Sequence, residues 1–519
     1  MRNRVHFRFS ISSHPQEASS PVNDATPANR PGVSKREVIC WFLAALVVKG
    51  AYLLVLGDAP RLRGDAIVYV ESIENLVMRG TYAWDLTRTE TFAARMPGMF
   101  LPYGFLRLFF SPVHSQALQQ CAQAILDSAA VVALLSFALR LKLGLPGARV
   151  VTLIYLLSTL VSSWNDDLTT ESLAASGAFL GIWLCAKGAE ERSRSQLVLG
   201  ALLLAWVGFL KAFYFGWIAA VATSIAWVEF RRNRRDLVSP IKLWVAILLP
   251  FLVLVSVWTA RNGLATGRFV PLQDGINGGY LYPAEFSALR SYMRAVGGDF
   301  VSWNPKAEVR WFDPWAGQTR PQGAEYPPDE IDLPRGVVTE ACDRRKLLAV
   351  RNAYRTAQTT REESLKRVAS AAAVNGLLEC RAAFIEERPW DYRVVAPLKL
   401  LLAYVGHSGT YDLFPRPFSQ LTPAEKFFKV AQSSLHLGAV LFGISGALWI
   451  LASGLASGHP GLPVAVAALG HALGFPLILR LAEYRYLVMG YPLLFLCAGV
   501  VISAAFDSHR RNSPRNAHL

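Results

Sequence analysis

Long apolar segments constrain the fold of this 519-residue chain more than any other feature of its sequence. A helix needs about 20 mostly apolar residues to cross the hydrocarbon core of a bilayer. About ten segments reach or approach that length. They lie near residues 39–57, 115–139, 148–163, 169–187, 196–210, 212–230, 241–259, 429–453, 460–480 and 485–506. The pattern predicts an all-α polytopic membrane protein with about ten transmembrane helices.

Basic residues gather in the short connections between these segments. The formal net charge of +15 alone would also suit a nucleic-acid-binding protein. Its distribution argues otherwise, because the clusters fall at 140–149, 187–194, 231–235 and 510–515. Connections rich in Lys and Arg stay in the cytoplasm. We therefore expect a multi-pass plasma (inner) membrane protein with both termini cytoplasmic, and no nucleic-acid partner.

This topology divides the chain into five parts. The residues before the first span are rich in Pro, Ser and Asn, which is typical of disorder. The long polar stretch after residue 259 contains turn-rich sequence and then a helical pattern over 337–385, which predicts a folded insertion. The expected parts are a disordered cytoplasmic tail (1–37), an N-terminal transmembrane catalytic module (38–259) with an outer loop (58–114), an extracytoplasmic insertion with juxtamembrane helices (260–428), C-terminal transmembrane helices (429–506) and a cytoplasmic tail (507–519).

Two of the six cysteines, Cys342 and Cys380, lie in the predicted insertion. Disulfides persist in oxidising compartments, and no other cysteine is expected outside the membrane. The sequence therefore predicts a Cys342–Cys380 disulfide, with two separately buried thiols as the alternative. The other four cysteines lie in apolar spans, and no cysteine spacing resembles a metal site.

An acid follows the first span almost at once. Asp65 precedes Tyr69 by one helical turn, so that both lie on one helical face. Arg95 comes next, before a Pro-Gly break and an amphipathic run that is expected to lie along the membrane interface. An acid fixed there beside a tyrosine and an arginine is a plausible place for chemistry. The alternative is that Asp65 is only a solvated loop carboxylate.

Two further groups of charges fall on the same predicted membrane face. Asp166, Asp167 and Glu171 stand at the outer end of two spans, where they could also be the polar turn of a helical hairpin. Arg261 stands at the outer end of another span, where it could be a helix-end anchor whose head group reaches the interface. The glycines of the segment that follows Arg261 would let backbone approach a ligand closely.

Three more positions carry charge at or within the spans. Lys211 lies between two hairpin spans and could mark the turn alone. Lys49 lies in the middle of a span, so it should face a partner or a wet cavity. Glu483 and Arg485 precede the last span and could form a simple ion pair.

Together, these motifs resemble a known family. Their order is GDxxxY in the first outer loop, R-x-P-G, an outer-end TE, a lysine between hairpin spans, RN…GRFVP and a final E-x-R-Y. This order is similar to that of GT-C glycosyltransferases, specifically family-39-like enzymes related to protein O-mannosyltransferases and the lipid A aminoarabinose transferase. The resemblance covers roughly residues 40–505. It implies a GT-C-like fold, a lipid-borne polyprenyl-phosphate sugar as donor, an acceptor on the outer face, and an essential acid that Asp65 matches, with Tyr69 matching the tyrosine that follows it.

The resemblance and the residue types together suggest roles. We expect a hexosyl- or pentosyltransferase with Asp65 as general base and Asp166 or Asp167 as a second acid. The candidates for binding the substrate and its phosphate are Tyr69, Arg95, Glu171, Lys211, Arg261 and Arg485. Many relatives have a second acid next to the first, where this chain has Ala66. That difference weakens a metal site there, so the need for a divalent metal stays open.

One geometric expectation follows from the enzyme reading. Asp65, one or both of Asp166 and Asp167, and Arg261 should converge on one cavity that opens sideways toward lipid. The competing readings are a transporter or lipid flippase, which would use Lys49 and the outer charges as a substrate path, and a non-catalytic assembly partner in envelope biosynthesis.

Overall fold

The computed structural model describes residues 33–56, 62, 64–274, 283–298, 312, 336–414 and 416–512. Within these ranges the chain forms helices and no strands, so the predicted all-α fold is confirmed. Most of the predicted N-terminal tail (1–32), the end of the C-terminal tail (513–519) and most of the turn-rich part of the insertion (299–311 and 313–335) lie outside the described residues.

All ten predicted spans form helices. Eight helices of the described residues are long and apolar enough to cross a membrane, and seven of them coincide with predicted spans. These seven are α1 (Lys35–Leu56), α4 (Pro112–Arg140), α5 with α6 (Gly144–Leu157 and Thr159–Ser162), α7 (Glu171–Glu191), α10 (Val238–Thr266), α17 (Pro423–Ser457) and α19 (Arg485–Asn512). The remaining three predicted spans are α8 (Arg194–Leu210), α9 (Tyr214–Arg232), and α18 (Leu462–Leu469) continued by the π-helical segment η5 (Gly470–Ile478).

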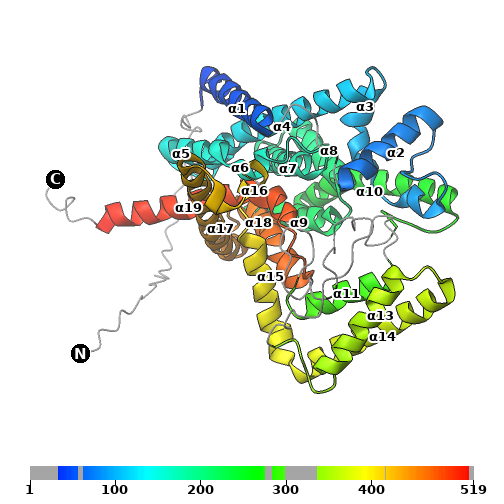
Figure 1. Cartoon of the computed structure of the whole chain (residues 1–519). Coiled ribbons are helices and arrows are strands. Elements are labelled where there is room, and N and C mark those ends of the chain that lie inside the picture. The colour runs from blue at the N-terminus through cyan, green and yellow to red at the C-terminus, as the bar shows by residue number, and fades with distance from the viewer. Residues whose placement is uncertain are drawn as a thin grey trace, which may run out of the picture.

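The eighth apolar helix, α14 (Glu363–Glu387), belongs to the insertion. It packs with α11 (Ala284–Ala295) and α13 (Arg344–Thr359) around a hydrophobic core separate from that of the transmembrane bundle. Figure 1 shows these three helices together, to one side of the bundle. The predicted disulfide joins Cys342 to Cys380, with their Cα atoms 5.1 Å apart. The helical pattern predicted for 337–385 thus corresponds to α13 and α14.

Short helical segments return the chain from the insertion to the bundle. They are η3 (Asp391–Val395), α15 (Ala396–Val405), α16 (Thr410–Leu413) and η4 (Phe418–Gln420). The sequence placed juxtamembrane helices in 260–428 without giving their bounds. The helix α15 lies in this range, packs against η5 and donates a hydrogen bond from the hydroxyl of Tyr404 to the carbonyl of His471 at 2.9 Å. Figure 1 shows α15 running from the insertion to the bundle.

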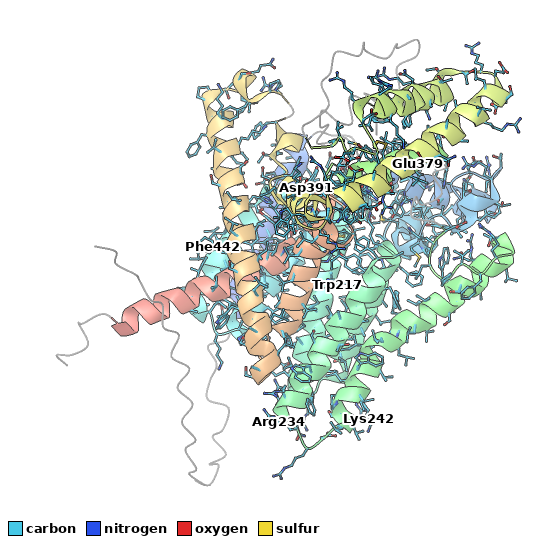
Figure 2. All side chains as sticks on the ribbon, turned by 90° about the horizontal axis from the view of Figure 1, so that it is seen from below. Trp217, Arg234, Lys242, Glu379, Asp391 and Phe442 are labelled. Carbon is cyan, nitrogen blue, oxygen red and sulfur yellow. A yellow bond between two sulfur atoms is a disulfide. The ribbon has the colours of Figure 1, made fainter. Side chains whose placement is uncertain are left out.

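The two ends of the bundle differ in what they carry. Arg234 and Lys242, in and after a short connection between spans, lie at the end opposite the insertion, whose side carries Glu379 and Asp391 (Figure 2). Basic short connections at one end and the insertion at the other are the arrangement that the predicted orientation requires.

Lys49 has the partner that its place in a span demands. Its ammonium lies 3.0 Å from a carboxylate oxygen of Asp127 on α4 and donates a hydrogen bond to the hydroxyl of Ser162 at 2.7 Å. Asp127 also accepts hydrogen bonds from Tyr155 at 3.0 Å and Asn165 at 3.2 Å. Both charged side chains are fully buried. Lys49 therefore joins α1 to α4 and to α6.

Candidate functional site

Asp65 is held between two arginines from distant parts of the chain. It is the first residue of α2 (Asp65–Arg79), and it follows Gly64, whose φ of 53° favours glycine. Arg95 donates to one carboxylate oxygen of Asp65 at 2.6 Å, and Arg485, the first residue of α19, donates to the other at 2.7 Å. The Asp65 side chain is only 13% exposed. Both of its oxygens are therefore engaged by guanidinium groups.

Tyr69 fixes α2 against the end of α8. Its side chain is buried, and its hydroxyl donates to the carbonyl of Leu210 at 3.4 Å. The guanidinium of Arg95 lies 5.3 Å from the centre of the Tyr69 ring, within the range of a cation–π contact. The tyrosine one turn after Asp65 thus helps to hold both the acid and its arginine.

The Pro-Gly break after Arg95 docks the outer loop on α8. Pro97 and Gly98 begin the short helix η2 (Pro97–Phe100), and Trp206 on α8 donates to the carbonyl of Gly98 at 2.9 Å. A Cβ added to Gly98 would lie 2.4 Å from the backbone of Phe209, so only glycine fits this approach. The motif therefore brings Arg95 to the end of α8, where Lys211 follows.

Lys211 and Glu171 add a buried ion pair beside Asp65. Lys211 follows the last residue of α8, and its ammonium lies 2.9 Å from the carboxylate of Glu171, the first residue of α7. Arg485 lies 3.9 Å from the same carboxylate and 2.6 Å from that of Glu483. Arg485 therefore stands at the centre of three acids that come from α2, α7 and the segment before α19.

Most of these charged groups line a cavity of about 290 Å³, namely Asp65, Arg95, Lys211, Glu483 and Arg485. Apolar and aromatic side chains form much of the rest, and the lining includes Phe213, Phe475, Leu479, Leu481 and Tyr486. The rings of Phe475 and Tyr486 stack with their centroids 4.4 Å apart, and Phe213 packs edge-on against both. The cavity thus combines a charged wall with an apolar one.

The short connection between η5 and α19 supplies alternate residues to this cavity. Leu479, Leu481, Glu483 and Arg485 line it. Between them, Tyr484 is buried and stacks on His407, with ring centroids 3.7 Å apart. The alternation explains how one short segment contributes both apolar and charged groups to the same cavity.

The arginines determine the charge state of Asp65. Burial alone would raise the pKa of the Asp65 carboxyl, because it disfavours the charged form. The charges of Arg485, Arg95 and Lys211 outweigh that effect and hold the pKa well below its usual range. Asp65 is therefore ionised throughout the physiological pH range.

The structure brings together most of the predicted site residues. Asp65, Tyr69, Arg95, Lys211 and Arg485 all line the cavity, and Glu171 does not line it but forms ion pairs with Lys211 and Arg485. They come from five separate segments of the chain. Their roles in binding or catalysis remain proposals, which are argued below.

Asp166 and Asp167 do not line this cavity, so the predicted convergence is wrong for them. Both are fully buried in the segment between α6 and α7. Gln120 on α4 donates to the carboxylate of Asp166 at 2.8 Å, and Gln123 donates to the carbonyl of Asp167 at 3.0 Å. The predicted polar hairpin turn is instead folded into the bundle, where α4 holds its backbone.

Arg261 does not line the cavity either, so the same prediction is wrong for it. Its guanidinium donates to the carbonyls of Phe92 and of Tyr82, the latter at 2.7 Å. It also lies 4.8 Å from the ring of Trp258. Arg261 therefore ties the segment that contains Tyr82 and Phe92 to α10.

The sequence did not single out several lining residues as site residues. Glu483 was read as a simple ion-pair partner of Arg485, and the structure shows that pair at the cavity. Gln273 and Arg290 also line the cavity, but neither belongs to a motif, because Gln273 follows the GRFVP segment and Arg290 lies on α11. The E-x-R-Y motif before the last span, which begins at Glu483, is the signal that could have identified it.

The described residues do not provide a metal site. Among them, no group of three or more His, Cys, Asp or Glu side chains is arranged to hold a metal ion. The donor set at Asp65 fits a metal poorly, because both carboxylate oxygens already accept hydrogen bonds from arginines.

The fold and the site define a polytopic α-helical membrane protein with a charged cavity where the ends of several apolar helices meet. No protein-family model matches the chain, and no curated protein sequence matches it significantly. The chain is similar to two solved structures of ArnT from Cupriavidus metallidurans, one in the apo state and one bound to undecaprenyl phosphate.

Both similarities are distant. The identity is 15% in each case, with TM-scores of 0.34 and 0.33. The matches cover 89% and 90% of this chain, and 77% and 78% of the two ArnT chains. ArnT is the lipid A aminoarabinose transferase, one of the relatives that the sequence resemblance names. With TM-scores this low, the function has to be inferred from the side chains of the site.

Proposed function

We propose that the protein is an integral membrane glycosyltransferase that moves a sugar from a polyprenyl-phosphate donor to an acceptor hydroxyl on the outer face of the membrane. The observation that carries this proposal is the arrangement of Asp65 between Arg95 and Arg485, with Lys211 beside them, in a cavity that also has an apolar wall. This combination suits a substrate that joins a phosphate to a lipid chain.

The cationic groups suit a donor phosphate. Arg95, Arg485, Lys211 and Arg290 line the cavity, and guanidinium and ammonium groups are the natural partners of phosphate oxygens. Arg485 and Lys211 stand where apolar helices begin or end. A phosphate bound there would keep its polyprenyl chain close to the bilayer. Moving an apolar chain from the bilayer into water costs free energy. The sideways opening toward lipid stays a prediction.

Asp65 is the group that we assign as general base. In the proposed reaction the acceptor oxygen attacks the anomeric carbon of the sugar while its proton passes to a carboxylate oxygen of Asp65. The bond between that carbon and the phosphate oxygen breaks, and its electron pair stays on the departing polyprenyl phosphate. Arg95, Arg485 and Lys211 stabilise the negative charge that develops on this leaving group.

The same arginines couple donor binding to the basicity of Asp65. They hold the pKa of its carboxyl low, and a carboxylate with so low a pKa is a weak base. A donor phosphate would compete with Asp65 for the guanidinium groups of Arg95 and Arg485. Sharing them weakens their hold on Asp65 and raises its pKa, so the base becomes stronger when the donor is bound.

A transporter or flippase path through Lys49 has less support. Such a path needs an ionisable group that meets a passing substrate, whereas Lys49 is fully buried against Asp127 and Ser162. Those contacts suit a role in joining helices. No described group favours metal chemistry, so we propose transfer that relies on the side chains of the cavity.

A transfer assay with an Asp65→Asn variant tests this proposal. Membranes that contain either protein are supplied with a panel of labelled undecaprenyl-phosphate pentoses and hexoses, and loss of label from the carrier is followed by thin-layer chromatography. Removing a general base lowers such rates by about 10²- to 10⁴-fold. An Arg345→Gln variant, changed at an exposed position in the insertion, serves as the control and should transfer at the wild-type rate. Transfer by Asp65→Asn at the wild-type rate would contradict the proposal.

A further inference from the structure

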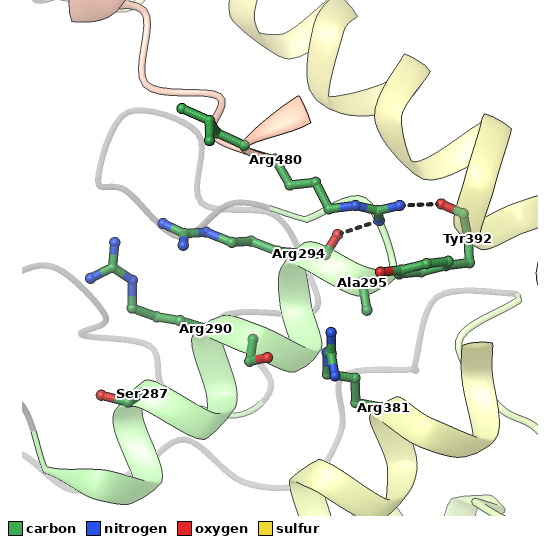
Figure 3. A pocket seen from close by; sticks show the side chains of 9 residues that line it. Ser287, Arg290, Arg294, Ala295, Arg381, Tyr392 and Arg480 are labelled. Atoms are coloured by element: carbon green, nitrogen blue, oxygen red, sulfur yellow. Dashed lines mark hydrogen bonds between the residues drawn. The ribbon is translucent and has the colours of Figure 1, made fainter. Parts of the chain in front are cut away.

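A second cavity, of about 340 Å³, lies between the insertion and the bundle. Its described lining includes four arginines: Arg290 and Arg294 on α11, Arg381 on α14, and Arg480 in the connection that leads to α19. Figure 3 shows these side chains around the cavity, with Tyr392 beside Arg480. None of the described lining residues is acidic. The described lining of this cavity is therefore basic, whereas that of the first cavity contains both acids and bases.

The backbone and its neighbours fix Arg480 in this cavity. Its φ of 53° lies in the left-handed region, which is uncommon for a residue with a side chain. Its guanidinium donates to the carbonyl of Tyr392 at 2.6 Å and to that of Arg294 at 3.4 Å, and it lies 3.8 Å from the centre of the Tyr392 ring. Carbonyls and a ring orient a guanidinium without cancelling its charge.

Arg480 and Arg381 reinforce the positive charge of the cavity. Burial lowers the pKa of Arg480; the phenol of Tyr392 opposes this effect, and the neighbouring charge of Arg381 adds to it. Arg381 forms no ion pair with the described part of the chain. Placing like charges close together costs free energy through their repulsion. An anion bound between them would offset that cost.

The two cavities adjoin. Arg290 and Leu479 line both of them. Along the connection before α19, Leu481, Glu483 and Arg485 line the cavity of Asp65, whereas Arg480 lines the basic one. A single molecule could therefore place one group in each cavity.

We propose that the basic cavity binds a phosphate group of the acceptor, while a hydroxyl of the same molecule reaches Asp65. This inference rests on the proposed function. Arginine guanidinium groups match phosphate oxygens in geometry as well as in charge, and the cavity is large enough for a phosphate and part of the group that bears it. Arg381 and Arg480 are then positioning residues that select a phosphorylated acceptor and do not take part in the chemical step.

Two phosphate monoesters serve as probes of this site. Glycerol 1-phosphate represents a soluble acceptor, and phosphatidic acid in phosphatidylcholine nanodiscs represents a lipid head group. Binding of each probe to the purified full-length protein is measured for wild type, Arg381→Gln and Arg345→Gln, with undecaprenyl phosphate binding as a parallel readout. Arg345 matches Arg381 in charge and also lies in the insertion, but it is exposed and outside the cavity.

The proposal predicts that Arg381→Gln weakens binding of at least one probe by about tenfold or more, because a charge-assisted hydrogen bond is lost. Arg345→Gln should leave probe binding unchanged, and both variants should bind undecaprenyl phosphate as wild type does. Loss with glycerol 1-phosphate indicates a soluble acceptor, and loss with phosphatidic acid alone indicates a lipid one.

An Arg485→Gln variant separates this proposal from the proposed function. It should weaken binding of undecaprenyl phosphate and leave binding of the affected probe intact. If the probe is lost in Arg485→Gln and not in Arg381→Gln, it occupies the cavity of Asp65 and the acceptor site is refuted. If Arg381→Gln affects neither probe, the acceptor site is also refuted, while unchanged carrier binding leaves the proposed function standing.

Discussion

Asp65 and Arg485 are 420 positions apart in the sequence, yet a guanidinium nitrogen of Arg485 lies 2.7 Å from a carboxylate oxygen of Asp65. This contact joins the start of α2 in the first outer loop to the start of the last transmembrane helix, α19. A site that depends on both ends of the chain forms only when the whole bundle is assembled. Its integrity therefore reports on the complete fold.

The pH dependence of stability should show that Asp65 is already ionised. Arginines hold its folded-state pKa below the unfolded value of about 3.9, so its stabilising effect is fully present above that value and is lost as the pH falls toward the folded pKa. We therefore expect the difference in melting temperature between wild type and Asp65→Asn to be constant from about pH 5 to 8 and to shrink only below about pH 4. A difference that changes between neutral pH and pH 5 would show that the pKa is not depressed.

Breaking the buried pair of Lys49 and Asp127 should destabilise the bundle. A Lys49→Met substitution leaves a carboxylate uncompensated in the membrane, which typically costs about 3–5 kcal/mol. Adding Asp127→Leu removes that charge and should recover part of the loss, although Tyr155 and Asn165 then lose an acceptor. Thermal unfolding of the purified variants measures both effects. Equal stability of wild type and Lys49→Met would contradict the role of this pair.

Reducing the Cys342–Cys380 disulfide should loosen the insertion and leave the bundle intact. The bridge joins the segment just before α13 to α14, across 38 positions of the chain. In the chain-entropy model such a loop contributes about 4 kcal/mol of stability. We expect a Cys342→Ser/Cys380→Ser variant to show faster hydrogen exchange in α11, α13 and α14, with unchanged protection in α7 and α8. Unchanged exchange throughout the insertion would show that its core is stable without the bridge.

The sequence predicted the fold well because its information is local. Each span is one continuous apolar run, so its existence follows from hydropathy alone, and all ten predicted spans are helices. The bounds of the helix α15 were not predicted, because it is short and lies in a range that was assigned as a whole to the insertion and juxtamembrane helices. The helix α14 has span-like composition, yet it falls in the helical pattern that the sequence assigned to the insertion, and it packs there on α11 and α13.

The site was predicted only in part, because motifs show the depth of a residue and not the direction of its side chain. Asp65, Arg95, Lys211 and Arg485 converge, as their positions at span ends allowed. Arg261 shares that depth, but its guanidinium binds carbonyls of the outer loop, whose path the sequence does not reveal. The burial of 163–170 depends in the same way on glutamines of α4 that no pattern marks.

Binding of undecaprenyl phosphate by Arg485→Gln tests the central claim most directly, because Arg485 contacts Asp65, Glu171 and Glu483 in the cavity. Dissociation constants are measured in nanodiscs for wild type, Arg485→Gln and the exposed control Arg345→Gln. The account predicts a loss of affinity of about tenfold or more for Arg485→Gln, from the loss of a charge-assisted contact, and none for the control. Equal affinities of correctly folded Arg485→Gln and wild type would contradict a carrier phosphate in this cavity.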